Sequence, residues 1–272
     1  MTLSPATRWA LRLSLIVVLG FLYVPLLLVL INSFNASRIF SWPPESYTTG
    51  WWRAALESEG VRSAMIESVK VASLATVVAL LLGTMISFAV ARYTWFGRSS
   101  ISFLFVLPIA LPGIVTGVAL QNAFVNVLST DRFQIQLGFW TVAIGHTTFC
   151  IVVIFNNVVA RLRRTGQSLE EASMDLGAST FQTFRLVTFP QIRSALVAGA
   201  LLAFGLSFDE VIVTQLTTAN GFETLPIWIF NNLSRPNNAP IVNVVAAFVI
   251  IISIIPVYFA QRLSDDPSHT RL

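Results

Sequence analysis

The chain has 272 residues, of which 55% are hydrophobic and only 11% are charged. Soluble domains carry about 25% charged residues, so this composition excludes an ordinary soluble domain and favours a membrane protein surrounded by lipid. The net charge of +4 is small, and the arginines cluster at the ends of apolar runs, which argues against nucleic acid as a partner. Cys150 is the only cysteine in the sequence, so no intrachain disulfide can form.

Apolar runs long enough to cross a bilayer recur along the chain, since about 20 helical residues span the hydrocarbon core. The first run, residues 13–31, follows Arg8 and Arg12 and lacks a signal-peptide cleavage pattern, so we expect it to be a membrane span. The segment 32–68 is polar and aromatic, and residues 49–58 are expected to form a short interfacial helix. The predicted spans are residues 13–31, 69–91, 101–127, 139–160, 192–217 and 241–263.

The third span contains Pro108, Pro112, Gly113 and Gly117. Such helix breaks are tolerated in a membrane only where neighbouring groups satisfy the freed backbone. The third span is therefore expected to face protein or a cavity rather than lipid.

The distribution of basic residues predicts the orientation of the chain. The cluster Arg161, Arg163 and Arg164 closes the fourth span on the same side as Arg8 and Arg12. Because cytoplasmic ends of spans carry an excess of Lys and Arg, both termini and the polar loop 168–190 are expected in the cytoplasm.

Helix-start patterns occur twice in the loop 168–190. Ser168 followed by Glu171, and Ser179 followed by Gln182, have the spacing of a capping box. Gly177 lies where a left-handed residue would end the first helix. The pattern predicts two short helices joined by a bend; an ordinary solvated loop with two amphipathic turns is the alternative.

The loop 168–190 also resembles a known element. Its Glu171-Ala172-Ser173, Gly177, Val187 and Phe189-Pro190 are similar, in residue type and spacing, to the EAA loop of permease subunits in ABC importers. Similarity to the spermidine/putrescine-type permeases extends to residues 107–113 and 145–150. The resemblance implies an all-α, polytopic membrane protein with six spans, forming a single permease domain over residues 1–272. It implies that the residues coupling the chain to an ATPase are Glu170, Glu171, Ala172, Asp175, Gly177 and Pro190.

The same resemblance implies the partners: a second homologous permease, a cytoplasmic ATPase dimer and an external substrate-binding protein, at a bacterial inner membrane. Lys70 is the only lysine and no Gly-rich run precedes it, so the sequence has no phosphate-binding loop. ATP hydrolysis is therefore expected in a separate subunit, and no catalytic, cofactor or metal motif is found.

Two acids lie in the fifth predicted span, Asp209 and Glu210, and the nearest basic residue in that helix is Arg193. Acids in a span usually face a cavity or a partner, so they could line the pathway of a cationic solute; the permease resemblance favours this reading. The alternative is that the span ends early and both acids lie at the outer water boundary. In a continuous helix, Asp209 would share a face with Gly205.

Other polar residues of the spans are weaker candidates for the substrate pathway. His146 in the fourth span lies at a depth similar to that of Asp209. Bonding of the His146 ring to neighbouring backbone is the favoured interpretation, and a hydrogen bond to Asp209 is the alternative. Gln121 and Asn122 lie near the outer end of the third span and could touch substrate or join helices.

The sequence is therefore interpreted as the permease subunit of an ATP-driven importer, with polyamines such as spermidine and putrescine as the expected substrate. Another organic cation, an amino acid derivative or an organophosphonate is an alternative substrate. A self-contained channel or secondary carrier is a further alternative.

Overall fold

The computed structural model describes residues 4–38, 42–98, 100, 103, 111–130, 132–219, 221–235 and 238–264. Regular secondary structure in these residues is helical, which confirms the predicted all-α class. The elements are α1 Pro5–Asn32, α2 Gly50–Glu57, α3 Glu59–Arg92, α5 Gly113–Asn122, η1 Ala123–Val127, α6 Phe139–Thr165, α7 Ser168–Asp175, α8 Thr180–Thr183, η2 Phe184–Thr188, α9 Phe189–Phe208, α10 Ile212–Thr217, α11 Leu225–Leu233 and α12 Ala239–Ser264.

Long apolar helices dominate the described residues. Four are long and apolar enough to cross a membrane: Pro5–Asn32, Glu59–Arg92, Phe139–Thr165 and Thr180–Phe208. Shorter apolar helices cover Gly113–Val127 and Ala239–Ile254. Each of these helices overlaps one of the predicted runs, while the count of six spans stays a prediction. Helix α3 begins at Glu59 instead of residue 69, and the carboxylate of Glu59 complements the positive helix N-terminus.

The third predicted span is interrupted, as expected from its prolines. Pro112 is the N-cap of α5, and α5 continues into a π-helical turn, η1. Because proline lacks an N–H and clashes with the preceding turn, it begins a helix better than it continues one. Pro108 and the rest of 104–110 lie outside the described residues.

The described residues form two compact units, one within Met1–Arg62 and Trp228–Val257, the other within Ser63–Ile227 and Tyr258–Leu272. The single domain that the sequence predicts over residues 1–272 stays a prediction.

The first unit contains α1, α2 and most of α11 and α12. Apolar side chains are exposed along the length of α1, as expected for a helix that meets lipid. The short helix expected at 49–58 is confirmed as α2, and the ring of Trp52 stacks on Phe34.

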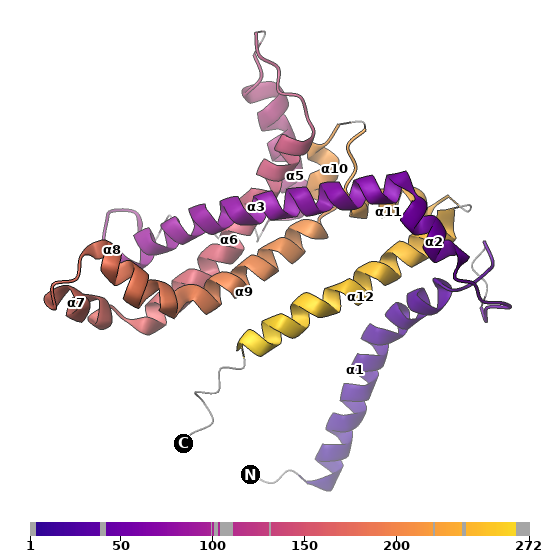
Figure 1. Ribbon diagram of the computed structural model, residues 1–272, viewed down its shortest axis with the longest axis horizontal. Helices are drawn as coiled ribbons and strands as arrows, with labels where there is room; N and C mark the ends of the chain where they lie inside the picture. Colours follow the sequence, from indigo (N-terminus) through magenta and orange to yellow (C-terminus); the bar gives the residue numbers. More distant parts are fainter. Residues whose placement is uncertain are drawn as a thin grey trace. The chain divides into compact units, whose positions relative to one another are not determined.

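In the second unit α6 is the central helix, with α9 packed along it (Figure 1). Its buried residues contact small side chains of the neighbouring helices; the core includes Ala75, Ala79, Cys150, Ile154, Val158, Leu162, Ile192 and Ala203. Small residues let membrane helices approach closely. Gly83 of α3 and Gly199 of α9 both lie beside Ile154 of α6, so both helices can pack closely against it.

Gly83 provides a test of this close packing. A Cβ at Gly83 would lie 2.9 Å from Ile154 Cβ and 3.0 Å from the Ile151 carbonyl oxygen. We expect Gly83→Ala to destabilise the chain by about 1–3 kcal/mol, because overpacking forces the helices apart. Gly20→Ala is the matched control, since a Cβ there has nothing within 4 Å. Equal thermal midpoints for the two purified variants would contradict this packing.

The fifth predicted span, 192–217, is wrong as a continuous helix. The structure has two helices: α9 ends at Phe208 and α10 begins at Ile212. At the break, the side chain of Glu210 accepts the backbone N–H of Val213 at 2.8 Å. A side chain that bonds nearby backbone competes with the helical hydrogen bonds, so the acid that was expected inside a span instead helps to interrupt it.

The loop after α6 is only partly as predicted. The capping box of Ser179 and Gln182 is confirmed by both of its hydrogen bonds. The first box is wrong: Ser168 is the first residue of α7, and its N-cap is Gln167, which makes no side-chain cap bond. We expected two short helices, but only α7 is short. The second helix is long, because α8 continues through the π-helical turn η2 into α9.

Gly177 has the left-handed conformation predicted for it, with φ +85°. The Gly177 N–H donates to the Met174 carbonyl and the Ala178 N–H donates to the Ser173 carbonyl. These two bonds form a Schellman motif that ends α7. The bend at Gly177 is therefore confirmed.

Candidate functional site

Asp209 and Glu210 lie at the break between α9 and α10 and differ in their surroundings. Asp209 is the C-cap of α9 and is exposed, and no hydrogen bond or ion pair to its carboxylate is found within the described residues. Glu210 is half-buried and its carboxylate caps the first turn of α10. The expected arrangement of both acids on one helix is therefore wrong. Of these two acids, only Asp209 has a carboxylate without a hydrogen bond to another described residue.

His146 connects the two sides of this break. Its Nδ1 lies 2.8 Å from Ser207 Oγ on α9, and its Nε2 lies 2.8 Å from Thr214 Oγ1 on α10. The expected backbone partners of His146 and the alternative bond to Asp209 are both wrong, because these two hydroxyls occupy both ring nitrogens. Thr214 donates its only hydroxyl proton to the Glu210 carbonyl, so in the neutral ring Nε2–H donates to Thr214 and Nδ1 accepts from Ser207.

Helix α6 holds the interrupted span at further points. Thr141 Oγ1 donates to the Thr217 carbonyl at 2.7 Å, and Cys150 Sγ donates to the Ala203 carbonyl at 3.4 Å. His146 itself is fully buried. These contacts hold the chain on both sides of the break against α6, while Asp209 itself is exposed.

Gln121 and Asn122 lie at the end of α5, which packs against α10 (Figure 1). A Cβ on Gly117 would meet Leu216 Cδ1 of α10 at 2.6 Å, which shows how closely these helices approach. Gln121 is half-buried, and exposed Asn122 accepts a hydrogen bond from Asn126. Both residues lie on the neighbour of α10, and within the described residues neither is hydrogen-bonded to Asp209 or Glu210, so a role in substrate binding stays a prediction.

The residues predicted to couple to an ATPase differ in their exposure to solvent. Glu170 is half-buried and pairs with Arg92 at 2.9 Å. Glu171, Ala172 and Asp175 are exposed on α7, and Pro190 lies in the first turn of α9. Large apolar side chains are exposed around them, namely Leu169, Met174, Leu176, Phe181 and Leu186. Exposed apolar side chains next to acids are typical of protein-binding surfaces, and coupling of this loop to an ATPase stays a prediction.

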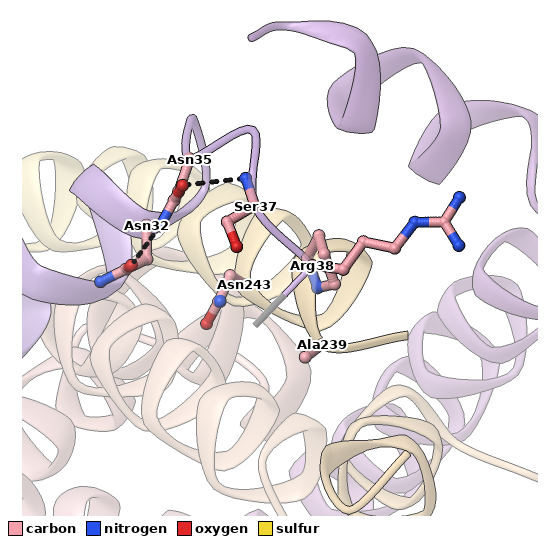
Figure 2. Close-up of a pocket in the computed structure, with 7 residues that line it drawn as sticks. Asn32, Asn35, Ser37, Arg38, Ala239 and Asn243 are labelled. Carbon is pink, nitrogen blue, oxygen red and sulfur yellow. Dashed lines mark hydrogen bonds between the residues drawn. The ribbon is translucent and has the colours of Figure 1, made fainter. Parts of the chain in front are cut away.

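A small pocket lies elsewhere, in the unit that contains α1 and α12 (Figure 2). Its cavity volume is about 30 Å³, enough for a few water molecules at most. Asn32, Asn35 and Asn243 line it, while the guanidinium of Arg38 lies over the ring of Trp51. The pocket is too small for an organic solute. In the part of the chain that the structure describes, no group of three His, Cys, Asp or Glu could hold a metal ion.

These features, apolar helices around an interrupted span and a capped polar loop, are those of a membrane transport subunit. Residues 79–266 match the family of inner membrane components of binding-protein-dependent transport systems. The chain belongs to this family of ABC importer permeases, which confirms the resemblance found in the sequence.

Individual relatives cover most of the chain. The putrescine transport system permease protein PotI of Escherichia coli (strain K12) is 32% identical over 86% of this chain and 84% of its own. The spermidine/putrescine transport system permease protein PotC of the same strain is 30% identical over 91% and 90%. A bacterial alginate ABC transporter, solved with a periplasmic protein that binds an alginate pentasaccharide, has a chain of the same fold (TM-score 0.73, 14% identity, 98% and 96% coverage).

Proposed function

We propose that this chain forms half of the translocation pathway of an ATP-driven polyamine importer, and that Asp209 lines the pathway. The observation that carries the proposal is the exposed carboxylate of Asp209, without an ion-pair partner in the described residues, at a break between two apolar helices. Interrupted helices form the solute sites of many transporters, and an acid in a span marks an ion or substrate path. The names of PotI and PotC support putrescine or spermidine as the solute.

The alternative position of the acids, at the outer water boundary, has a specific difficulty. Ser207 and Thr214 on either side of them are buried and bonded to a fully buried His146. The residues on both sides of Asp209 are therefore packed against α6. This supports a position of Asp209 within the helical part of the protein, not beyond its outer end. Glu210, Gln121 and Asn122 remain secondary candidates for lining the pathway. His146 stabilises the break through its bonds to Ser207 and Thr214.

The loop 168–190 is proposed to be the docking element for a cytoplasmic ATPase, with six spans and both termini in the cytoplasm. The contact surface would be α7, with exposed Glu171 and Asp175 beside exposed Leu169 and Leu176. The remaining parts of the complex would be a second permease and an external binding protein. The binding-protein-dependent family supports this composition.

Copurification followed by transport tests the proposal. The tagged chain is expected to copurify with an ATPase and a second permease. Proteoliposomes of that complex, with ATP on the ATPase side and loaded binding protein on the other, should take up labelled putrescine or spermidine. Uptake without any ATPase would indicate a channel or carrier and contradict the proposal. An active complex that transports another solute, with no competition by polyamines, would contradict only the substrate.

A further inference from the structure

Arg92, at the end of α3, is bonded to three separate points of the chain around the loop 168–190. Its guanidinium donates to the Leu162 carbonyl at 3.1 Å, the Gly166 carbonyl at 3.0 Å and Glu170 Oε1 at 2.9 Å. Leu162 lies in the last turns of α6, Gly166 follows that helix, and Glu170 lies in α7. One side chain thus joins the ends of two long helices to the short helix of the loop.

The same oxygen of Glu170 has a second partner. Thr188 Oγ1, at the end of η2, donates to Glu170 Oε1 at 3.1 Å. A further hydroxyl contact joins α7 to α8, since Ser173 Oγ lies 3.1 Å from Thr183 Oγ1. Helix α7 is therefore tied to α3 through Arg92 and to the start of α9 through Thr188.

The surroundings of this cluster make it more than a surface ion pair. The side chains of Arg92 and Glu170 are only 10% and 16% exposed, and Thr188 is buried. Exposed pairs contribute little because water and salt screen them, whereas removing one partner of a desolvated pair leaves the other charge uncompensated. Arg92 also cannot be replaced by lysine without loss, because its planar fork reaches three acceptors at once.

We infer that Arg92, Glu170 and Thr188 form a clamp that positions α7 and transmits its movement to two membrane helices together. The inference rests on the proposed function, in which an ATPase docks on α7. A displacement of α7 pulls α3 through Arg92 and α9 through Thr188, so both helices move with the docking element. Arg92 is a positioning residue that acts through Glu170 without contacting solute or nucleotide.

The test compares clamp variants in the whole complex, with labelled polyamine uptake and ATP hydrolysis measured in the same proteoliposomes. Arg92→Gln and Glu170→Gln are each expected to reduce the solute transported per ATP at least fivefold. The double variant is expected to be no worse than the more severe single one, because residues that act as one unit are not additive. Arg163→Gln, which changes an exposed arginine near the end of α6, is the matched control and should match wild type.

A second readout reports the position of α7 directly. Hydrogen exchange of the backbone at 168–178 should be at least tenfold faster in Arg92→Gln than in wild type, and unchanged in Arg163→Gln. Thr188→Val keeps its shape and removes only the hydroxyl, so it tests the other arm of the clamp should Arg92→Gln fail to assemble. It is expected to lower transport per ATP about twofold to fivefold.

Failure of the clamp and failure of the proposed function can be told apart. A wild-type complex without an ATPase or without uptake contradicts the proposed function. An active wild-type complex whose clamp variants lose thermal stability but keep transport per ATP and exchange at 168–178 would show a purely structural ion pair and overturn the clamp. Additive losses in the double variant would overturn it as well.

Discussion

Asp209→Asn is expected to reduce polyamine uptake by at least tenfold while the complex still assembles. Asparagine keeps the size and hydrogen-bonding capacity of the side chain, so the substitution isolates the charge. Coulomb attraction is weakly screened in a site of low dielectric constant, and a dication passing Asp209 would lose an attractive partner there. The measurement is uptake of labelled putrescine or spermidine by proteoliposomes containing the complete complex.

Two further substitutions control this result. Glu210→Gln should have a smaller effect, because a glutamine oxygen can still accept the Val213 N–H that Glu210 accepts now. Glu45→Gln removes an exposed carboxylate from the segment between α1 and α2 and should leave uptake unchanged. Wild-type uptake in both Asp209→Asn and Glu210→Gln would remove the acids from the pathway, and with them the main residue-level reason for a cationic substrate.

Gly177→Val is expected to uncouple ATP hydrolysis from transport, with at least a tenfold loss of uptake. The φ of +85° at Gly177 penalises any side chain, by about 1–2 kcal/mol for an L-residue and more for a β-branched one. A Cβ there would have nothing within 4 Å, so the loss arises from backbone strain instead of a clash. Strain would open the Schellman motif and turn α7 away from its partner.

The matched control for this prediction is Gly177→Asn. Asparagine enters the left-handed region more readily than other residues with a side chain, so this variant should retain most of the uptake. The measurement is uptake together with the ATP hydrolysis that loaded binding protein stimulates. A Gly177→Val complex that assembles and transports at the wild-type rate would show that the bend is not required for coupling.

The features that were predictable from the sequence depend on residues close together in the chain. The left-handed Gly177 and the cap of Ser179 by Gln182 are decided within a few residues, and apolar length alone placed the long helices. Ser168 shows the limit of this reasoning, because spacing identified a possible cap but not the register of the helix start.

What the sequence could not provide are contacts between distant segments. His146 meets Ser207 and Thr214 across 61 and 68 residues, and Arg92 meets Glu170 across 78. No local pattern carries such a pairing. The same contacts explain why the break after Phe208 was missed. The apolar residues on both sides of it resemble one continuous helix, and the bonds of Ser207 and Thr214 that stabilise two separate helices are made to His146 of the distant helix α6.

The π-helical turn η2, Phe184–Thr188, sets the rotation of α9 relative to α8 about the axis of their shared helix. A π turn accommodates an additional residue within an otherwise α-helical run, and each residue of a helix corresponds to about 100° of rotation. The faces of α9 are thereby rotated relative to α8 by about that angle. Shortening η2 by one residue would keep the helix continuous from Thr180 to Phe208, yet it would swing Ser207 away from His146 and turn the end of α9 that carries Asp209 toward a different neighbour. The register of one turn in the loop thus determines which direction the carboxylate faces some twenty residues later.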